Sequence, residues 1–448
     1  MLGEQGTCKN LARRVFIKTY GCQMNVYDSE RVVQLLQGCN YQVTSELTEA
    51  DLIILNTCSI REKPEHKLYS ILGRLKRLKD KNPTLILGVG GCVAQQEGES
   101  LFKKSPHLDL VFGTHTINKL PHLLKVVEEK RAKVCETTMC ESGYLDEGVF
   151  DASSQKVSSY VSIIRGCSNF CSFCVVPYVR GRERSRPKEE ILKEVEHLSQ
   201  RGVKEVILLG QNVNAYGNDL GSNGGFPRLL TSINEIRGIE RIRFITSHPK
   251  DLSDDLIRCF KELDKVCEHI HLPVQSGSNR ILKLMKRGYT RENYIKKVDK
   301  LRRVCPEIGI TSDVIVGFPQ ETQRDFEDTL DMMKRVKFDD LFSFQYSNRP
   351  MTLANHFKDK IPSDVKRERL EILQEIQNEY SLEKNKSVVD KIEEVLVEGV
   401  STKDPHCMTG KTRSNKTVNF MGGDILRGKL LSVKIKNAHL HSLSGELV

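Results

Sequence analysis

The chain has 448 residues, 38% hydrophobic and 29% charged, a globular composition long enough for about three domains or for one barrel with smaller attachments. No run approaches the roughly 18 uninterrupted apolar residues of a membrane helix, and residues 1–14 lack the apolar segment of a secretory signal, so we expect a soluble, cytoplasmic protein. In a reducing compartment its 14 cysteines are metal-ligand or redox candidates, and the net charge of +10 is compatible with an anionic partner.

The first third of the chain alternates β-branched runs with amphipathic stretches, which predicts an open parallel-sheet α/β domain over residues 13–131. The predicted strands are Val15–Thr19, Leu52–Asn56, Leu85–Val89 and Leu108–Phe112. The predicted helices are Ser29–Gln37, His66–Lys79 and Ile117–Glu129. Between Arg131 and Val157 the periodicity is lost, which indicates a linker and a domain boundary.

The middle block, residues 153–385, repeats the same alternation. Its predicted strands are Tyr160–Ile164, Glu205–Leu209, Arg241–Thr246, His269–Leu272, Gly309–Val316 and Asp340–Phe344. Its predicted helices are Lys188–Gln200, Asp255–Leu263, Asn293–Val304 and Arg324–Lys334. Such units form a full or partial (βα) barrel or a second doubly wound sheet, and we expect a partial barrel of six strands.

The last block, residues 386–448, follows a predicted helix that ends near Lys386. It contains short strand-like runs separated by glycine and polar turns, at Ile392–Val397, Thr417–Phe420 and Leu430–Lys436. A small antiparallel β-barrel is the fold that such a short segment predicts.

Three cysteines within eight residues, Cys167, Cys171 and Cys174, form a C-x3-C-x2-C motif after the first predicted strand of the middle block. We call them the loop cysteines. Three thiolates in a tight loop can hold three corners of a four-iron cluster and leave the fourth iron open to a molecule with amine and carboxylate groups. A structural zinc site is the alternative, but it requires a fourth ligand, and none stands at short spacing.

A second set, Cys22, Cys58 and Cys92, lies just past the carboxyl ends of three predicted strands in the first domain. We call these the sheet cysteines. Such strand ends face one crevice in an open parallel sheet, so residues far apart in sequence can converge there on a single ligand. Three ordinary buried thiols are the alternative, because cysteine is often fully buried. We interpret Gly90 and Gly91 as letting the backbone approach a bound group, since their run lacks the full dinucleotide spacing.

The stretch RGCSNFCSFC, residues 165–174, resembles the cluster loop of radical S-adenosylmethionine enzymes. Its continuation CVVPYVRGRERSR, residues 174–186, resembles the methylthiotransferase family within that group. The resemblance implies that the loop cysteines bind a [4Fe-4S] cluster whose open iron chelates S-adenosyl-L-methionine, with Phe173 beside this cofactor. It also implies a second [4Fe-4S] cluster on the sheet cysteines.

Two further segments, YGCQMN at residues 20–25 and NTCSIREK at residues 56–63, look like the branch of the family that modifies tRNA. That branch implies methylthiolation of C2 of N6-(dimethylallyl)adenosine at position 37, beside the anticodon. The electron would come from a flavodoxin-like donor, the sulfur from the second cluster and the methyl group from a second S-adenosyl-L-methionine. The alternatives are another tRNA adenosine or a ribosomal-protein aspartate as substrate, and a non-catalytic zinc protein that binds RNA.

Polar residues at the ends of the barrel strands are candidates for contacts with the adenosyl group: Asn212, Gln275 and Asp313. His269 and His271 form an H-x-H pair that we expect on opposite sides of a strand, so we predict no metal site there. Catalytic residues other than the cluster ligands are not predicted. The remaining cysteines are interpreted as non-ligands: Cys8, Cys39, Cys135, Cys140, Cys259, Cys267, Cys305 and Cys407.

Two basic segments suggest a polyanion, and solvated protein surface is the alternative for both. The first follows the loop cysteines and contains Arg180, Arg182, Arg184, Arg186 and Lys188. The second lies in the last block and contains Lys411, Arg413, Lys416, Arg427, Lys429, Lys434 and Lys436. The last block resembles the TRAM module of RNA-modifying enzymes, which favours RNA, and an anticodon loop offers the unstacked base that chemistry on a nucleotide requires.

Overall fold

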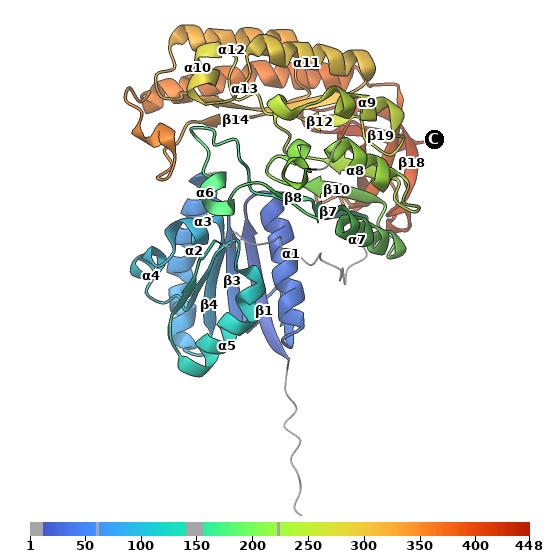
Figure 1. The fold of residues 1–448 in the computed structure, drawn as a ribbon. Coiled ribbons are helices and arrows are strands. Elements are labelled where there is room, and N and C mark those ends of the chain that lie inside the picture. The colour runs from blue at the N-terminus through green and yellow to red at the C-terminus, as the bar shows by residue number, and fades with distance from the viewer. Residues whose placement is uncertain (1–11, 60–61, 140–155, 222–224) are drawn as a thin grey trace, which may run out of the picture. The chain divides into compact units, whose positions relative to one another are not determined.

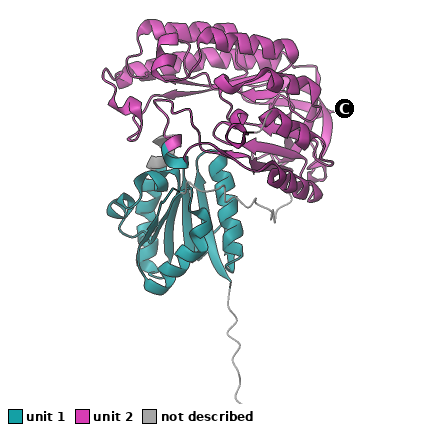
Figure 2. Ribbon diagram, in the orientation of Figure 1, with its two compact units in different colours: residues 1–143, 178–180 teal, residues 144–177, 181–448 magenta. Residues whose placement is uncertain are grey.

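The computed structural model describes residues 12–59, 62–139, 156–221 and 225–448, without the side chains of residues 62–66. The chain forms two compact units (Figure 2). Unit 1 comprises residues 1–143 together with the short segment Tyr178–Arg180, and unit 2 comprises residues 144–177 and 181–448. The proposed division into three domains stays a prediction. In the described part of the chain, no helix has the length and apolar character needed to cross a membrane.

Unit 1 contains a six-stranded parallel sheet with the order β2-β1-β3-β4-β5-β6 (Figure 1). The strands are β1 Arg13–Tyr20, β2 Tyr41–Val43, β3 Leu52–Thr57, β4 Ile86–Gly91, β5 Leu110–Phe112 and β6 Val134–Glu136. The predicted open sheet is confirmed, and β2 and β6 extend it at both edges. Strand β6 lies within the stretch that was predicted as a linker, so the sheet extends beyond residue 131. Each of these edge strands has three residues, too few to show an alternating pattern.

Helices cover both faces of this sheet. They are α1 Gln23–Gln37, α2 Glu62–Lys81, α3 Cys92–Glu97, α4 Ser100–Lys104 and α5 Leu120–Lys130. Leucines and valines of α1 and α5 pack against one face, and those of α2, α3 and α4 pack against the other. The central strands β3 and β4 are buried along their whole length, as expected for a parallel sheet covered on both sides.

Unit 2 contains the six parallel strands that the sequence predicts for the barrel. They are β7 Ser158–Ser162, β10 Glu205–Leu209, β11 Arg241–Phe244, β12 His269–His271, β13 Gly309–Val316 and β14 Asp340–Gln345. They form the sheets β11-β10-β7 and β12-β13-β14, and a parallel bridge between Ile242 and Val266 connects the two. A short antiparallel pair, β8 Ile164–Arg165 and β9 Arg184–Ser185, closes the base of the segment that carries the loop cysteines.

Helices alternate with these strands, and most of them share one core with the strands. They are α6 Val176–Arg180, whose last three residues belong to unit 1, α7 Lys188–Gln200, α8 Gly225–Asn234, α9 Asp254–Glu262, α10 Asn279–Leu284, α11 Arg291–Val304, α12 Gln323–Val336 and α13 Ser363–Lys386. The helices predicted in this block are all present. Their boundaries follow side-chain caps, such as Ser253 on α9 and the capping box of Thr322 and Asp325 on α12.

The C-terminal block forms a closed five-stranded barrel with the order β15-β16-β17-β19-β18. Its strands are β15 Ile392–Val400, β16 Cys407–Thr412, β17 Thr417–Met421, β18 Leu430–Ala438 and β19 Leu443–Leu447. Four of the five pairings are antiparallel, and the pairing of β17 with β19 is parallel. A small core of alternating residues, among them Val395, Met408 and Phe420, fills the interior.

Arginines join this barrel to the rest of unit 2. Arg243 on β11 forms a buried ion pair with Glu205 and donates to the carbonyls of Thr412 and Arg413 at 2.6 and 2.9 Å. Arg241 donates to the carbonyl of Lys411 at 2.7 Å. In the opposite direction, Arg413 binds the carboxylate of Glu268 through two nitrogens at 2.7 and 2.8 Å. These contacts fix the barrel on the amino ends of the strands β11 and β12.

Candidate functional site

The sheet cysteines emerge side by side from three neighbouring strands. Tyr20, Thr57 and Gly91 are paired across β1, β3 and β4, so the residues that follow them start from the same level of the sheet. Cys22 comes two residues after Tyr20, and the other two cysteines directly follow Thr57 and Gly91. The strand order reverses between β1 and β3, and open α/β sheets bind ligands at such a switch point.

The three thiols interact with one another. The side chain of Cys58 is hydrogen-bonded to those of Cys22 and Cys92, and the negative charges of these two thiolates also act on it. Hydrogen bonding with Cys58 lowers the pKa of Cys22 and of Cys92, and the charge of Arg180 lowers both further against the cost of burial. Hydrogen bonding with these two thiols, burial and their charges raise the pKa of Cys58. Cys22 and Cys92 therefore favour the thiolate, the form that binds metals, whereas Cys58 favours the thiol.

Arg180 and Asp28 lie beside the sheet cysteines and were not predicted as site residues. The Arg180 Nε donates to the Sγ of Cys92 at 3.3 Å, and its Nη2 forms an ion pair with the Asp28 Oδ2 at 2.6 Å. The side chains of Arg180 and Asp28 are 2% and 1% exposed, so both charges are withdrawn from water. The sequence shows Arg180 only as one member of a basic run.

The structure shows a packing requirement at Gly90 and Gly91, and their approach to a bound group stays a prediction. A Cβ on Gly90 would lie 2.4 Å from the Cζ of Phe112, and a Cβ on Gly91 would lie 2.7 Å from the carbonyl oxygen of Thr57. Gly91 also has a φ of +89°, which favours glycine. The two glycines are therefore required by packing within unit 1, where they allow β4 to turn into α3 at Cys92.

The loop cysteines lie in the segment between β8 and β9. The amide of Cys167 donates to the carbonyl of Gly181 at 3.1 Å, and the amide of Cys174 donates to that of Cys171 at 3.0 Å, which folds the segment into a tight turn. Burial raises the pKa of Cys167, and it raises the pKa of Cys174 to about 12, with the neighbouring cysteines adding to both shifts.

A second buried arginine contacts the loop cysteines. The Nη1 of Arg287 donates to the Sγ of Cys171 at 3.3 Å, while its Nε and Nη2 donate to the Tyr289 hydroxyl and the Pro273 carbonyl. Arg287 is 5% exposed. Nothing in the local sequence of Arg287 indicates this role, because the contact spans 116 residues.

Both thiol sets fit an iron–sulfur cluster by the chemistry of their donors, since each offers three soft sulfur ligands and leaves one corner open. Across the described residues, no three or more His, Cys, Asp or Glu side chains already stand in a metal-holding arrangement. The thiols of the sheet cysteines are hydrogen-bonded to one another instead. Binding a cluster would therefore release protons from them and reorient them.

Two of the predicted cofactor contacts, Asn212 and Gln275, follow the carboxyl ends of β10 and β12, whereas Asp313 lies within β13. Asn212 and Gln275 are buried, and their side-chain oxygens have no hydrogen-bond partner among the described residues. His248, which was not selected as a cofactor contact, has a buried Nε2 in the same condition. Asp313 is half-buried and lies 3.4 Å from the Nε2 of His271. Phe173 packs against a small apolar cluster around Met285 and Phe318 in the same unit.

The two histidines of the H-x-H pair were expected on opposite sides of a strand, and this expectation is wrong. His269 and His271 are two residues apart on β12, so they face the same side of the strand. Both rings contact the hydroxyl of Thr311, at 3.2 and 3.0 Å. The Nδ1 and Nε2 of His271 are thereby engaged by Thr311 and Asp313.

Of the other cysteines, Cys259, Cys267 and Cys305 are buried in unit 2. Cys39 is exposed, and Cys135 and Cys407 are half-buried. Cys8 and Cys140 lie outside the described residues. Their interpretation as non-ligands stays a prediction.

The first basic segment is only partly available to a polyanion. Arg180 and Arg186 are fully buried, and the Nη1 of Arg186 binds the carboxylate of Glu194 at 2.5 Å. Arg182 and Arg184 are exposed. The arginines at the two ends of this run therefore serve the interior, and Arg182 and Arg184 between them are its exposed arginines.

The second basic segment is divided in a similar way. Lys411, Arg413 and Lys416 face the core of unit 2, where Arg413 pairs with Glu268 and Lys416 lies 3.6 Å from a carboxylate oxygen of Asp339. Arg413 and Lys416 therefore join the barrel to the rest of unit 2, while the Nζ of Lys411 donates to Thr417 within the barrel. The exposed members of the segment are Arg427, Lys429 and Lys436, and Lys434 is half-buried.

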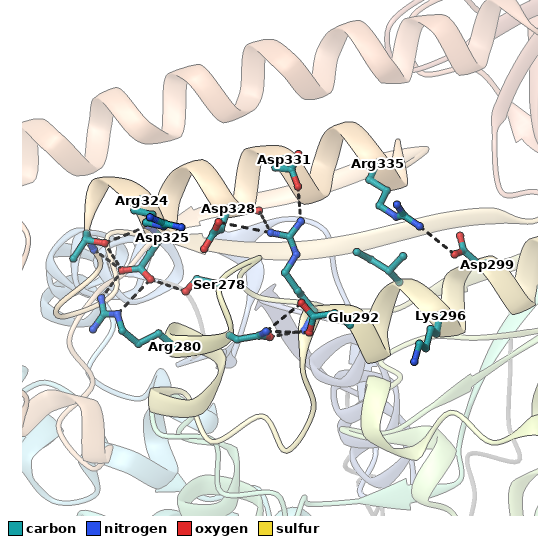
Figure 3. A pocket seen from close by; sticks show the side chains of 14 residues that line it. Ser278, Arg280, Glu292, Lys296, Asp299, Arg324, Asp325, Asp328, Asp331 and Arg335 are labelled. Atoms are coloured by element: carbon teal, nitrogen blue, oxygen red, sulfur yellow. Dashed lines mark hydrogen bonds and ion pairs between the residues drawn. The ribbon is translucent and has the colours of Figure 1, made fainter.

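A cavity of about 810 Å³ lies among the outer helices of unit 2, and neither thiol set lines it. Figure 3 shows Arg280 directed to Asp325. Arg291 forms ion pairs with Asp328 and Asp331. Its lining comes from α10, α11 and α12 and the segments next to them and includes no predicted site residue. Because Arg280, Arg291 and Arg335 are already paired with carboxylates, we interpret this cavity as a gap between packed helices.

Three family models match the chain. One is described as uncharacterized protein family UPF0004 and matches residues 14–113. The Radical SAM superfamily matches residues 161–333, and the TRAM domain matches residues 386–448. The sheet cysteines all fall in the first match and the loop cysteines in the second.

Curated relatives are similar over nearly the whole chain. A protein of Syntrophus aciditrophicus is 52% identical over 97% of this chain and 95% of its own length. A protein of Syntrophobacter fumaroxidans is 49% identical over 97% of this chain and 96% of its own length. Both are named tRNA-2-methylthio-N(6)-dimethylallyladenosine synthase.

Solved structures support the fold. The radical S-adenosylmethionine methyltransferase TsrM from Kitasatospora setae has a TM-score of 0.56 at 15% identity, and the match covers 77% of this chain and 75% of that chain. The cobalamin-dependent S-adenosylmethionine radical enzyme OxsB has a TM-score of 0.53 at 15% identity, over 82% of this chain and 56% of that chain. At this level of identity the likeness concerns the architecture alone.

Proposed function

This chain belongs to the family of tRNA-2-methylthio-N(6)-dimethylallyladenosine synthases, and from that premise we propose that it adds a methylthio group to C2 of N6-(dimethylallyl)adenosine at position 37 of tRNA. The observation that carries the proposal is the meeting of the three sheet-cysteine thiols at the switch point of the unit 1 sheet, in addition to the loop cysteines of unit 2. Methylthiolation needs both a site that activates S-adenosyl-L-methionine and a source of sulfur, and two thiol sets can provide both.

We assign one [4Fe-4S] cluster to the loop cysteines and a second to the sheet cysteines. When bound, the first supplies reductive cleavage of S-adenosyl-L-methionine at its open iron, and the second supplies sulfur. The chain itself binds, orients and shields these groups. Arg287 and Arg180 each place one positive charge against one thiol set, which compensates part of the negative charge of the thiolates.

Polar groups at the barrel mouth suit an adenosyl group. The side-chain oxygens of Asn212 and Gln275 can accept hydrogen bonds from the adenine amino group or the ribose hydroxyls, since both oxygens are buried without a protein partner. Burial lowers the pKa of His248 to about 2, so its ring stays neutral at physiological pH and can accept or donate without adding charge. Phe173 and Asp313 complete the set of proposed cofactor contacts.

The C-terminal barrel suits a nucleic-acid partner. Its exposed basic residues include Arg427, Lys429 and Lys436, the last of which lies 3.0 Å from a carboxylate oxygen of Glu446. Positive side chains at such positions bind the phosphate backbone without reading sequence, while the target base is taken out of its stack for the reaction. We propose that they hold the anticodon arm and that a flavodoxin-like protein donates the electron.

Nucleoside mass spectrometry of isopentenylated tRNA, before and after incubation with the anaerobically reconstituted enzyme, tests the activity. A gain of methylthio groups on the dimethylallyl-modified adenosine supports the proposal, and modification of another adenosine or of a ribosomal protein instead would refute the substrate. The reconstituted chain should hold about eight irons, four for each cluster. A zinc content that matches the thiol sets would refute the cluster assignment.

Single cysteine variants separate the two thiol sets. Cys171→Ala should abolish cleavage of S-adenosyl-L-methionine, whereas Cys58→Ala should retain cleavage and lose sulfur insertion. Cys259→Ala, which removes an equally buried thiol from α9, is the control and should retain both activities. Equal cleavage by the wild type and Cys171→Ala would contradict the assignment of the loop cysteines.

A further inference from the structure

The guanidinium of Arg180 is held in a fixed position next to the thiol of Cys92. Its guanidinium is 2% exposed and uses Nε for the Sγ of Cys92 and Nη2 for Asp28. Its Nη1 is buried and has no hydrogen-bond partner among the described residues. A buried cationic donor left without a partner is costly, so such a group in a native fold calls for an explanation.

The backbone around Arg180 is also held within unit 1. The hydroxyl of Thr114 donates to the carbonyl of Val179 at 2.6 Å, and both are buried. This anchor and the Asp28 carboxylate fix the guanidinium from two sides. A planar guanidinium offers five donors in a fixed geometry, so holding two of its nitrogens determines the direction of the third.

A purely structural ion pair would not need this arrangement. Buried ion pairs add little to stability compared with well-packed apolar residues of the same size. In the pair of Arg180 and Asp28, the guanidinium donates to the Sγ of Cys92, and its Nη1 remains as a further donor. An anionic cluster whose sulfur atoms accept hydrogen bonds would use both features.

We propose that Arg180 is a positioning residue that donates to the iron–sulfur centre of the sheet cysteines and raises its reduction potential, with Asp28 setting the direction of the guanidinium. This inference rests on the proposed function, which places a cluster on these cysteines. A positive charge and a hydrogen bond next to the sulfurs favour the reduced, more negative state of a cluster. Removing Arg180 therefore makes the centre harder to reduce, and removing the charge of Asp28 makes it easier.

The experiment uses the full chain with all three loop cysteines replaced by Ala, so that only the second centre contributes to the signal. After anaerobic reconstitution, iron content is determined and the centre is titrated potentiometrically with electron paramagnetic resonance detection. Arg180→Met should lower the ratio of reduced to oxidised centre about tenfold at a fixed ambient potential, which is about 59 mV for a one-electron couple. Asp28→Asn should raise that ratio, and Arg180→Lys should fall between Arg180→Met and the parent chain.

The control is Arg186→Met, which removes a guanidinium that is equally buried and paired, with Glu194. It should leave the potential unchanged. Shifts of Arg180→Met and Asp28→Asn in the same direction, or no shift in either, would overturn the inference, because a merely structural pair would weaken the site in the same way from both ends. If Arg180→Met fails to hold iron, the direction of the Asp28→Asn shift decides the question.

The same experiment separates this inference from the proposed function. Absence of iron in the parent chain without loop cysteines would refute the second cluster itself. A parent chain that holds iron, together with a potential that does not respond to Arg180 or Asp28, would refute the role of Arg180 alone.

Discussion

Replacement of Arg243 by Met tests how the C-terminal barrel is held on unit 2. The side chain of Arg243 is 5% exposed and that of its partner Glu205 is 2% exposed, with the Nε and Oε2 atoms 2.6 Å apart. The remaining guanidinium nitrogens donate to the carbonyls of Thr412 and Arg413. The Arg243→Met variant keeps an apolar side chain in place but leaves the Glu205 carboxylate buried without its cation.

The expected cost follows from burial. Removing one partner of a buried ion pair costs about 3–5 kcal/mol, because the other charge stays behind without compensation. Arg413 and Glu268 form a second pair at the same junction, in contact through two nitrogens, whose side chains are 26% and 25% exposed. Water screens that pair, so Arg413→Met should cost only about 1 kcal/mol. The double variant Arg243→Met with Glu205→Gln should recover part of the loss, because it removes the uncompensated charge.

The measurement is urea unfolding followed by far-ultraviolet circular dichroism, since the chain contains no tryptophan. The free energy of unfolding should fall in the order wild type, Arg413→Met, Arg243→Met. Equal losses for the two arginine variants, or a double variant less stable than Arg243→Met, would refute the reasoning. In addition, Arg243→Met should weaken tRNA binding more than cleavage of S-adenosyl-L-methionine, because the carbonyls that it loses belong to the barrel.

Two further predictions concern stability. Gly91→Ala combines a φ of +89° with a Cβ 2.7 Å from a backbone oxygen and should lower the melting temperature by an amount equivalent to about 2–3 kcal/mol, whereas Gly73→Ala in α2, with nothing within 4 Å, should not lower it. His248 binds a proton near pH 6.5 when unfolded and near pH 2 when folded, because burial lowers its pKa. The unfolded state therefore binds more protons below pH 6.5, and stability falls as the pH falls, by up to about 1.4 kcal/mol per pH unit. His248→Gln should flatten that slope in urea unfolding at several pH values; an unchanged slope would contradict the assignment.

The architecture could be predicted where secondary structure has a long repeating signal. The buried strands β3 and β4 and the amphipathic helix α7 were found because their patterns extend over five or more residues. The edge strands β2 and β6 were missed because three residues cannot show a period, and they form only through pairing with a neighbour. The longer strands β16 and β19 of the C-terminal barrel were also missed, although β16 alternates buried and half-buried residues over six positions.

At the candidate site, the sequence indicates the thiols but not the groups around them. Cys22 and Cys92 could be brought together in advance because parallel strands place their carboxyl ends at one edge. Arg180 and Arg287 could not, since their contacts with sulfur depend on chain segments 88 and 116 residues away. The basic run around Arg180 was misinterpreted for the same reason: charge in a sequence does not show which side chains face inward.

The discontinuous composition of unit 1 has a consequence for biosynthesis. The tripeptide Tyr178–Arg180 leaves the ribosome after more than thirty residues that belong to unit 2 or lie outside the described part of the chain. A nascent chain that ends at residue 143 already has its whole parallel sheet but carries Asp28 without its guanidinium partner. A cofactor whose insertion at the sheet cysteines depends on Arg180 can therefore bind only after residue 180 has been synthesised. An N-terminal fragment that ends at residue 143 would lack this side chain.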